Sequence, residues 1–519
     1  MATVTVLSCV ERGLGFLYRV FLSRNVGSEG LGLYQIALSV IGVIMTISAS
    51  GIPITVSRMM IKDKANGEKD FCPTVTAGIL CAVGISLPVC ICCFAFKDLL
   101  AAIFPDVRCR LLFLIILPGA VITSVYAVIR GFFWGTKSFL TYSIIELAEE
   151  AFMVVVGIIL VYNARSVTEK TVFASVAVLV SYIFSFTLSS IVYFIKGGRL
   201  KNPKNKIKPL INSATPITFM RGATSLTASL IAVILPATLI AGGMSRSDAV
   251  SSFGIISGMT LPLLFIPSTI IGSVSLVLVP ELSNAFYRKN DLGLRANVEK
   301  ALMISACVSM VIIPIFIGAG PYIGELIYKN RQAGVYLQAA AIAMLPMSLS
   351  MISTSLLNSM GMEKKTLLYY LIGAGLLLLC VIFLPRVMGN YGLIAGYLFN
   401  FTVNAIFNIR LLKKICCEKL SFIKKQLIAL PLLAFCSVLC YFTHAFLAKI
   451  LTPFFSLAIC CVIIPICLLL LFEIFGVMRV NELIAALLPT KIKKSRLAKR
   501  KTRGNNFDYN KATIAVRDN

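Results

Sequence analysis

Apolar stretches of about twenty residues, separated by short polar joints, follow one another along almost the whole chain. A helix needs that length to cross a hydrocarbon core of ~30 Å, whereas membrane-barrel strands would be about half as long and would alternate in polarity. The pattern therefore predicts an all-α polytopic membrane protein with fourteen transmembrane helices. The expected spans are residues 4–24, 31–57, 74–96, 109–132, 140–162, 171–195, 210–241, 249–279, 298–319, 333–359, 366–386, 391–412, 424–447 and 453–476.

Proline interrupts the two longest of these spans, residues 210–241 and 249–279. Proline lacks a backbone N–H and its ring clashes with the preceding turn, so it kinks or breaks a helix. We therefore expect both spans to be kinked or broken at their prolines, which are Pro216, Pro236, Pro262 and Pro267.

Composition and charge point to the same class and set the orientation. Charged residues make up 14% of the 519-residue chain, against about 25% in soluble domains. Most of the net charge of +27 lies in loops after even-numbered spans and in the basic run 491–503. Because positive loops stay inside, both termini are expected on the cytoplasmic side of the cell membrane. The tail, residues 479–519, is expected to bind anionic lipids, and no nucleic-acid partner is expected.

The chain also resembles itself at an offset of about 226 residues. Residues 53–57 resemble residues 280–283, and residues 135–142 resemble residues 361–369. This offset predicts two pseudo-symmetric six-helix bundles, an architecture of transporters that bind substrate between the halves. The predicted divisions are bundles at 1–195 and 210–415, a basic cytoplasmic linker at 196–209, and helices 13 and 14 at 416–478.

Arginines inside the apolar spans are the first candidate site residues, because a cation at the bilayer centre costs at least ~2.5–3.5 kcal/mol. Arg12 and Arg19 lie seven residues apart and hence on one face of the first span. Arg221 occupies the corresponding position in the second half and would face the same cavity. Arg24 lies at the outer end of its span, where a cation can also simply reach the interface. Guanidinium groups pair two phosphate oxygens at once, so these arginines predict an anionic substrate.

Glutamates in the fifth span and amides in the twelfth form a second candidate group. Glu146 shares a helix face with Glu149 and Glu150. These acids either pair with the arginines or bind a coupling cation, Na⁺ or H⁺. Asn400 and Asn404 either line the cavity or hold helices together. The chain has a single histidine and no catalytic motif, so we expect a protein without enzymatic activity, bound metal or cofactor.

The first two spans carry an unusual run of arginines and glycines. It reads Arg12-x-Leu-Gly-Phe-x-x-Arg19, then Ser23-Arg24-x-x-Gly27-x-Glu29-Gly30-x-Gly32-Leu33-Tyr34, then Gly51-Ile-Pro53-x-x-x-Ser57-Arg58. This run resembles the stage V sporulation protein B family of the multidrug/oligosaccharidyl-lipid/polysaccharide exporter superfamily, as do residues 143–149. In that family the span-five glutamate is usually followed four residues later by an arginine, where this chain has Met153.

The resemblance implies a flippase for undecaprenyl-pyrophosphate-linked cell-wall precursors, similar to the lipid II flippase, serving spore cortex peptidoglycan or another polysaccharide. It implies alternating access, with Arg12 and Arg19 near the pyrophosphate and the lipid tail along helices 13 and 14. Cell-wall synthesis proteins are further expected partners. Two alternatives stay open here: a cation-coupled multidrug exporter of the same superfamily, and a membrane scaffold for cell-wall synthesis that transports nothing.

Overall fold

The computed structural model describes residues 2–68, 70–98, 103–288, 290–416 and 422–477, so the predicted basic tail lies outside the described residues. Within these ranges all regular structure is helical, which confirms the all-α class. The first part forms α1 (Ala2–Ala49), α2 (Ile52–Ala65), α3 (Cys72–Ala95), α5 (Val107–Gly135), α6 (Phe139–Asn163), α7 (Val167–Ile195), η1 (Lys204–Lys206) and α8 (Ile207–Ala241). The second part forms α9 (Arg246–Phe253), η2 (Gly254–Thr260), α10 (Leu261–Leu264), α11 (Ile266–Tyr287), α12 (Asp291–Tyr328), α13 (Arg331–Ala340), η3 (Ala341–Ala343), α14 (Met344–Ser359), α15 (Glu363–Phe383), α16 (Pro385–Met388), α17 (Tyr391–Ile415), α18 (Phe422–Leu447) and α19 (Pro453–Ile474).

The described residues contain twelve helical stretches that are long and apolar enough to cross a membrane. Two features explain why this number is smaller than the fourteen predicted spans. The first stretch, Thr3–Ala65, has 63 residues and covers two predicted spans at once. Helix α6 carries three glutamates and is not among the twelve. The multi-pass character is therefore confirmed, and the count of fourteen stays a prediction.

Helix α1 changes direction at Gly27, between the first two predicted spans. Its backbone there has φ 74° and ψ −177°, a region that only glycine occupies without strain. Nothing lies within 4 Å of where a Cβ would stand, so the backbone angle and not crowding requires glycine. The residues before and after Gly27 therefore form two separate helical segments.

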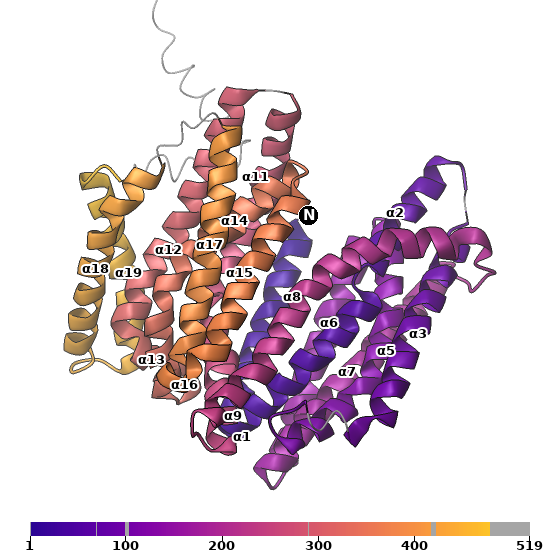
Figure 1. Ribbon diagram of the computed structural model, residues 1–519, viewed down its shortest axis with the longest axis horizontal. Coiled ribbons are helices and arrows are strands. Elements are labelled where there is room, and N and C mark those ends of the chain that lie inside the picture. The colour runs from indigo at the N-terminus through magenta and orange to yellow at the C-terminus, as the bar shows by residue number, and fades with distance from the viewer. Residues whose placement is uncertain (1, 69, 99–102, 289, 417–421, 478–519) are drawn as a thin grey trace, which may run out of the picture.

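The helices form two groups that meet at one end (Figure 1). One group contains α2, α3, α5, α6 and α7, and the other contains α11 to α19, with α1 and α8 between them. The groups lean apart toward the end that carries the N-terminus. Helices α18 and α19 pack on each other and on α12 at the edge of the second group. The division into bundles at residues 1–195 and 210–415 and the pseudo-symmetry between them stay predictions.

The two proline-containing long spans behave differently. Helix α8 remains one helix through Pro216 and Pro236, so the expected break does not occur there. The second span is divided into α9, the π-helical η2, α10 and α11. Pro262 and Pro267 each stand in the first turn of a new helix, where the missing N–H has no helical partner to lose.

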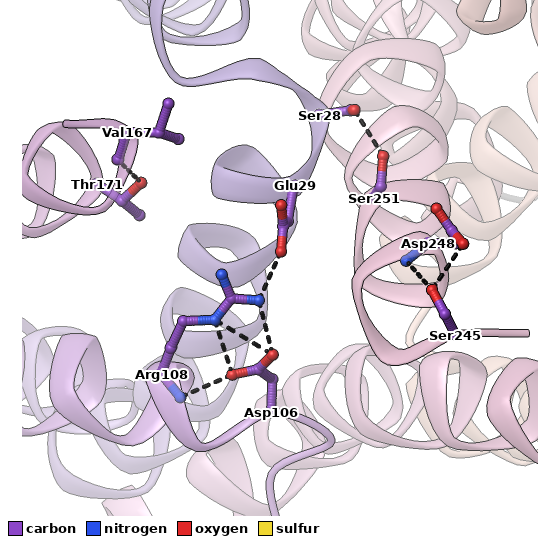
Figure 2. Close-up of polar contacts among 9 residues, drawn as sticks. All are labelled: Ser28, Glu29, Asp106, Arg108, Val167, Thr171, Ser245, Asp248 and Ser251. Atoms are coloured by element: carbon purple, nitrogen blue, oxygen red, sulfur yellow. Dashed lines mark hydrogen bonds and ion pairs between the residues drawn. The ribbon is translucent and has the colours of Figure 1, made fainter.

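At the end where the two groups meet, α1 crosses α9 and η2 (Figure 2). The hydroxyls of Ser28 and Ser251 lie 2.6 Å apart and share a hydrogen bond. A Cβ on Gly254 would overlap the carbonyl oxygen of Ser28 and lie 2.7 Å from the nitrogen of Gly32. Two backbones can approach this closely only because the facing residues are small. We call the contact of Ser28 and Gly32 with Ser251 and Gly254 the small-residue crossing.

An ion-pair cluster lies beside the small-residue crossing. Arg108 contacts Glu29 at 2.5 Å and Asp106 at 2.9 Å, so it joins α1 to the start of α5 (Figure 2). Asp106 also accepts a hydrogen bond from the backbone N–H of Arg108 and caps α5. Burial raises the pKa of Asp106, but the hydrogen bonds from Arg108 outweigh it and leave this pKa below its usual value. The cluster holds α1 against α5 at the end of the molecule where the two helix groups meet.

The predicted basic linker, residues 196–209, is fastened to the first group. Lys206 contacts Asp63 at 2.8 Å and Glu68 at 3.1 Å. Lys201 contacts Asp70 at 2.6 Å, and its hydrogen bond holds the pKa of that carboxyl at about 2. These ion pairs tie the linker to the end of α2 and to the segment that follows it.

Candidate functional site

Two neighbouring cavities that contain charged side chains lie beside α1. The larger one, about 940 Å³, is lined by α1, α6, α7, η2, α10 and α11, and we call it the arginine cavity. The smaller one, about 350 Å³, is lined by α1, α5, α6 and α8, and we call it the glutamate cavity. Glu11 and Glu150 line both, so the cavities adjoin through these two side chains.

Arg12 and Arg19 line the arginine cavity, as their shared helix face predicts. The guanidinium of Arg12 donates to the hydroxyl of Thr269 on α11, at 3.5 Å. No hydrogen bond or ion pair joins the guanidinium of Arg19 to another described residue. Arg19 is only partly buried and therefore presents a cation to the cavity.

Arg221 lines the glutamate cavity from α8. Its side chain is exposed, and like Arg19 it has neither a side-chain hydrogen bond nor an ion pair to any described residue. All three predicted glutamates, Glu146, Glu149 and Glu150, line the same cavity. The structure thus brings Arg221 together with the acids, while Arg12 and Arg19 occupy the adjoining cavity.

Arg130 on α5 is a site residue that the sequence analysis missed. It contacts Glu146 at 3.9 Å, and that carboxylate also accepts a hydrogen bond from Tyr142. The guanidinium carbon lies 5.4 Å from the ring centre of Trp134 and 5.9 Å from that of Tyr142, within the range of cation–π attraction. Arg130 therefore provides from α5 the arginine that residue 153 of α6 does not provide.

Two glycines let α6 approach α1 closely enough to share the cavities. A Cβ on Gly15 would lie 2.6 Å from Oε1 of Glu150. Further along, a Cβ on Gly157 of α6 would overlap the ring of Tyr18. Because both positions lack a side chain, the carboxylate of Glu150 reaches the face of α1 that carries the arginines.

Some polar atoms in this region have no partner among the described residues. The hydroxyl of Tyr126 and the Nε of Arg130 are buried and make no hydrogen bond, and both residues line the glutamate cavity. A buried polar atom without a partner costs about 1–3 kcal/mol. These atoms are therefore available to form hydrogen bonds with an ion, a water molecule or a substrate group.

Arg24 lies apart from both cavities. It donates to the carbonyl oxygens of Ile327 at 2.8 Å and Leu326 at 2.7 Å, at the end of α12. The last carbonyls of a helix lack intrahelical partners and carry partial negative charge. Arg24 thus ties the part of α1 just before the turn at Gly27, where the first predicted span ends, to α12.

The amide stripe of α17 also lies apart from the cavities. Asn404 donates to the side chain and backbone of Asn400 at 2.7 and 2.9 Å. A Cβ on Gly373 of α15 would overlap both amides, and Asn408 donates to Thr354 of α14. Of the two interpretations left open by the sequence, the contacts favour polar packing between helices.

The two cavities together contain a balanced set of charges. Four arginines, Arg12, Arg19, Arg130 and Arg221, and four glutamates, Glu11, Glu146, Glu149 and Glu150, line them. Such a set can hold an anion at the arginines while the carboxylates take up protons or metal cations. Glu11 and Arg130 were not predicted as site residues. Both are visible in the sequence as charges in the first and fourth spans, but nothing in the spacing showed that they face these cavities.

Comparison with known proteins gives the following matches. A family profile described as polysaccharide biosynthesis protein matches residues 1–286. The stage V sporulation protein B of Bacillus subtilis (strain 168) is 24% identical over 350 residues, which cover 64% of this chain and 67% of that protein.

Solved structures match the fold at low identity. The lipid II flippase MurJ in an inward closed conformation has a TM-score of 0.69 at 15% identity, covering 92% of this chain and 100% of that one. An inward-facing multidrug resistance MATE family transporter of the MOP superfamily has a TM-score of 0.65 at 15% identity, covering 78% and 94%. The fold is therefore that of these transporters.

Proposed function

The chain belongs to the polysaccharide biosynthesis protein family, and on this basis we propose that it is a flippase for a lipid-linked saccharide. The substrate class is an undecaprenyl-pyrophosphate-linked cell-wall precursor similar to lipid II. The names of its relatives support this class, since one is a sporulation protein and another a lipid II flippase. Its location is the cell membrane, with both termini in the cytoplasm and with cell-wall synthesis proteins as partners.

One observation carries the proposal. Arginines from α1 and from α8 line two adjoining cavities, and the larger of them lies between the first helix group and η2, α10 and α11. Among the residues that the structure describes, Arg19 and Arg221 have no anionic partner within ion-pair distance, so a pyrophosphate would supply one. Guanidinium groups pair well with phosphate oxygens, and a cavity between two helix groups is where transporters bind substrate.

The transport cycle is alternating access in this proposal. The groups meet at the small-residue crossing and lean apart at the other end, as an inward-facing state requires. The headgroup binds at Arg12, Arg19 and Arg221, and separation of the small-residue crossing then releases it outside. Fourteen spans in two pseudo-symmetric bundles would place the two arginine-bearing helices, α1 and α8, in equivalent positions.

The balance of four arginines and four glutamates supports a coupling cation. Adding a multiply charged anion to a neutral set leaves uncompensated negative charge in a low dielectric, which is unfavourable. Proton or Na⁺ uptake by Glu146, Glu149 or Glu150 would restore neutrality. An inside-negative potential drives outward movement of any remaining negative charge by ~2.3 kcal/mol per charge per 100 mV.

The test is a flipping assay with lipid II in sealed vesicles. The wild type is compared with Arg19→Ala and Arg221→Ala, with Arg24→Ala as a matched loss of one arginine outside the cavities. We expect the two cavity variants to lose flipping and Arg24→Ala to keep most of it. Full flipping by both cavity variants would refute the site, and no flipping by the wild type would refute lipid II as substrate.

The glutamates favour one second candidate, a cation-coupled multidrug exporter. Four carboxylates around α1 could hold an organic cation, and an exporter of this superfamily has the same fold. Drug-dependent proton or Na⁺ flux in vesicles, without lipid flipping, would support this candidate. That result would assign the acids to substrate binding and the arginines to pairing with them.

A further inference from the structure

Neutral polar side chains line the arginine cavity together with Arg19. Tyr34 and Gln35 come from the part of α1 that follows its turn, and Tyr182 comes from α7. The phenol of Tyr34 interacts electrostatically with the guanidinium of Arg19 and with the phenol of Tyr182, so the three side chains are neighbours. We call Tyr34, Gln35 and Tyr182 the tyrosine pocket.

The polar groups of the tyrosine pocket have no partner in the part of the chain that the structure describes. Neither phenol hydroxyl and neither end of the Gln35 amide makes a hydrogen bond to a described residue. Tyr34 is only 7% exposed, and polar groups in such surroundings normally have partners. A hydroxyl and an amide can each donate and accept, so the pocket suits a ligand that does the same.

The charges of the arginine cavity decide whether that ligand can be ionised. Two arginines, Arg12 and Arg19, and two acids, Glu11 and Glu150, line the cavity. The diester of a pyrophosphate carries two negative charges, which the two arginines match. A further carboxylate would face the two glutamates without a cation of its own, and an unpaired charge in a low dielectric is costly. The rest of the bound molecule must therefore be neutral.

We infer that the tyrosine pocket binds an uncharged sugar ring, the one attached to the pyrophosphate at Arg19. This inference rests on the proposed function and adds to it the class of the first sugar. A sugar offers several hydroxyls that donate and accept, and tyrosine presents a flat apolar ring together with a polar tip. A cavity with aromatic walls and a few polar groups is typical of sites for small molecules.

Glu150 gives the pocket a means to reject acidic sugars. Its carboxylate reaches the arginine-bearing face of α1 because Gly15 has no side chain, and a Cβ there would lie 2.6 Å from Oε1. Tyr34 and Tyr182 both interact electrostatically with this carboxylate. A uronic acid in the tyrosine pocket would place its own carboxylate next to that of Glu150.

The sugar contacts can be separated from the phosphate contacts by single-atom changes. Tyr34→Phe and Tyr182→Phe each remove one hydroxyl that has no partner among the described residues, so the fold loses no hydrogen bond. Tyr162→Phe on α6 is the matched control, since its exposed side chain lines neither cavity. Glu150→Gln removes the charge and keeps the size of the side chain.

The experiment measures binding to the full-length protein in nanodiscs with three geranyl pyrophosphate diesters, whose second ester group is methyl, N-acetylglucosaminyl or glucuronosyl. We expect the wild type to bind the N-acetylglucosaminyl probe at least about tenfold more tightly than the methyl probe, and the glucuronosyl probe no more tightly. Tyr34→Phe and Tyr182→Phe should each reduce the gain from the neutral sugar about 2- to 10-fold.

The same variants should bind the methyl probe like the wild type, which also shows that they fold. Tyr162→Phe should change nothing, and Arg19→Ala should weaken binding of all three probes. Glu150→Gln should tighten binding of the glucuronosyl probe more than that of the N-acetylglucosaminyl probe.

A neutral sugar that adds no affinity in the wild type would overturn the inference alone, as would a gain that both phenylalanine variants keep. The pocket would then hold water. A glucuronosyl probe that binds as tightly as the neutral sugar probe would also overturn it, because the charge argument would fail. A wild type that binds none of the three diesters would overturn the proposed function and the sugar site together.

Discussion

Replacing Gly254 with alanine should open the end of the molecule that the small-residue crossing closes. The new methyl group would overlap the carbonyl oxygen of Ser28 and lie 2.7 Å from the nitrogen of Gly32. Both neighbours are backbone atoms, which cannot rotate away. The crossing must therefore separate or shift, and only the closed state is affected.

The size of the effect follows from the overlap. Inserting a methyl group into a packed contact typically costs about 1–3 kcal/mol. The gain in helix propensity from glycine to alanine applies to the open and the closed state alike and cancels. A difference of about 1–3 kcal/mol changes the ratio of open to closed molecules by about 5- to 150-fold.

Disulfide cross-linking measures this ratio in membranes. The hydroxyls of Ser28 and Ser251 are 2.6 Å apart, so cysteines at these two positions lie within reach of a disulfide in the closed state. Mass spectrometry of the linked peptides identifies this bond among the sixteen native cysteines. We expect rapid cross-linking in the two-cysteine protein that keeps Gly254. In the same protein with Gly254→Ala, the cross-linking rate should fall in proportion to the smaller fraction of closed molecules.

The control is Gly84→Ala, which adds the same methyl group in open surroundings and should leave the cross-linking rate unchanged. If Gly254→Ala cross-links as fast as its parent, the closed contact tolerates the methyl group. The reasoning that close backbone approach holds this end shut would then be wrong.

Three further predictions concern residues outside the crossing. Asp63→Ala should lower stability by about 1–3 kcal/mol, because loss of the buried carboxylate leaves the hydroxyl of Thr74 without its acceptor and Lys206 with Glu68 alone. Glu68→Ala, which removes a half-exposed carboxylate, should cost less than about 1 kcal/mol; thermal unfolding in detergent compares the two variants. Asn404→Leu should cost about 0.6 kcal/mol and at most about 1.7 and leave the KM for flipping unchanged. Arg130→Ala and Glu146→Gln should each slow flipping, and the double variant should be no slower than the worse single one; additive losses would show that they act separately.

Much of the fold could be predicted from the sequence because lipid restricts the choice of structures. Apolar runs of spanning length must be helical, and a glycine between two such runs is a place to turn, as Gly27 does. Prolines were less informative. Pro216 and Pro236 stay inside α8 while Pro262 and Pro267 begin new helices, since a helix breaks only where neighbouring elements can satisfy the freed groups.

The candidate site was only half visible, because a side chain's direction depends on how its helix is rotated in the bundle. The spacing of Arg12 and Arg19 shows that they share a face, and both line one cavity. Arg24 lies five residues after Arg19, at the end of the predicted span, and reaches the carbonyls of α12 instead. Three arginines of one helix thus divide between a cavity and a helix terminus according to depth and rotation.

Arg130 shows why a local motif can mislead about an ion pair. With methionine at 153, α6 offers its glutamates no arginine one turn away, and the sequence leaves open whether these acids pair with other arginines or bind a cation. In three dimensions α5 supplies that charge, 3.9 Å from Glu146. Desolvated acids need compensation wherever it comes from, and in a bundle each helix has several neighbours that can provide it. A missing partner within a span is therefore a reason to examine the adjacent spans for an unexplained charge, and Arg130, in the fourth span, meets that description.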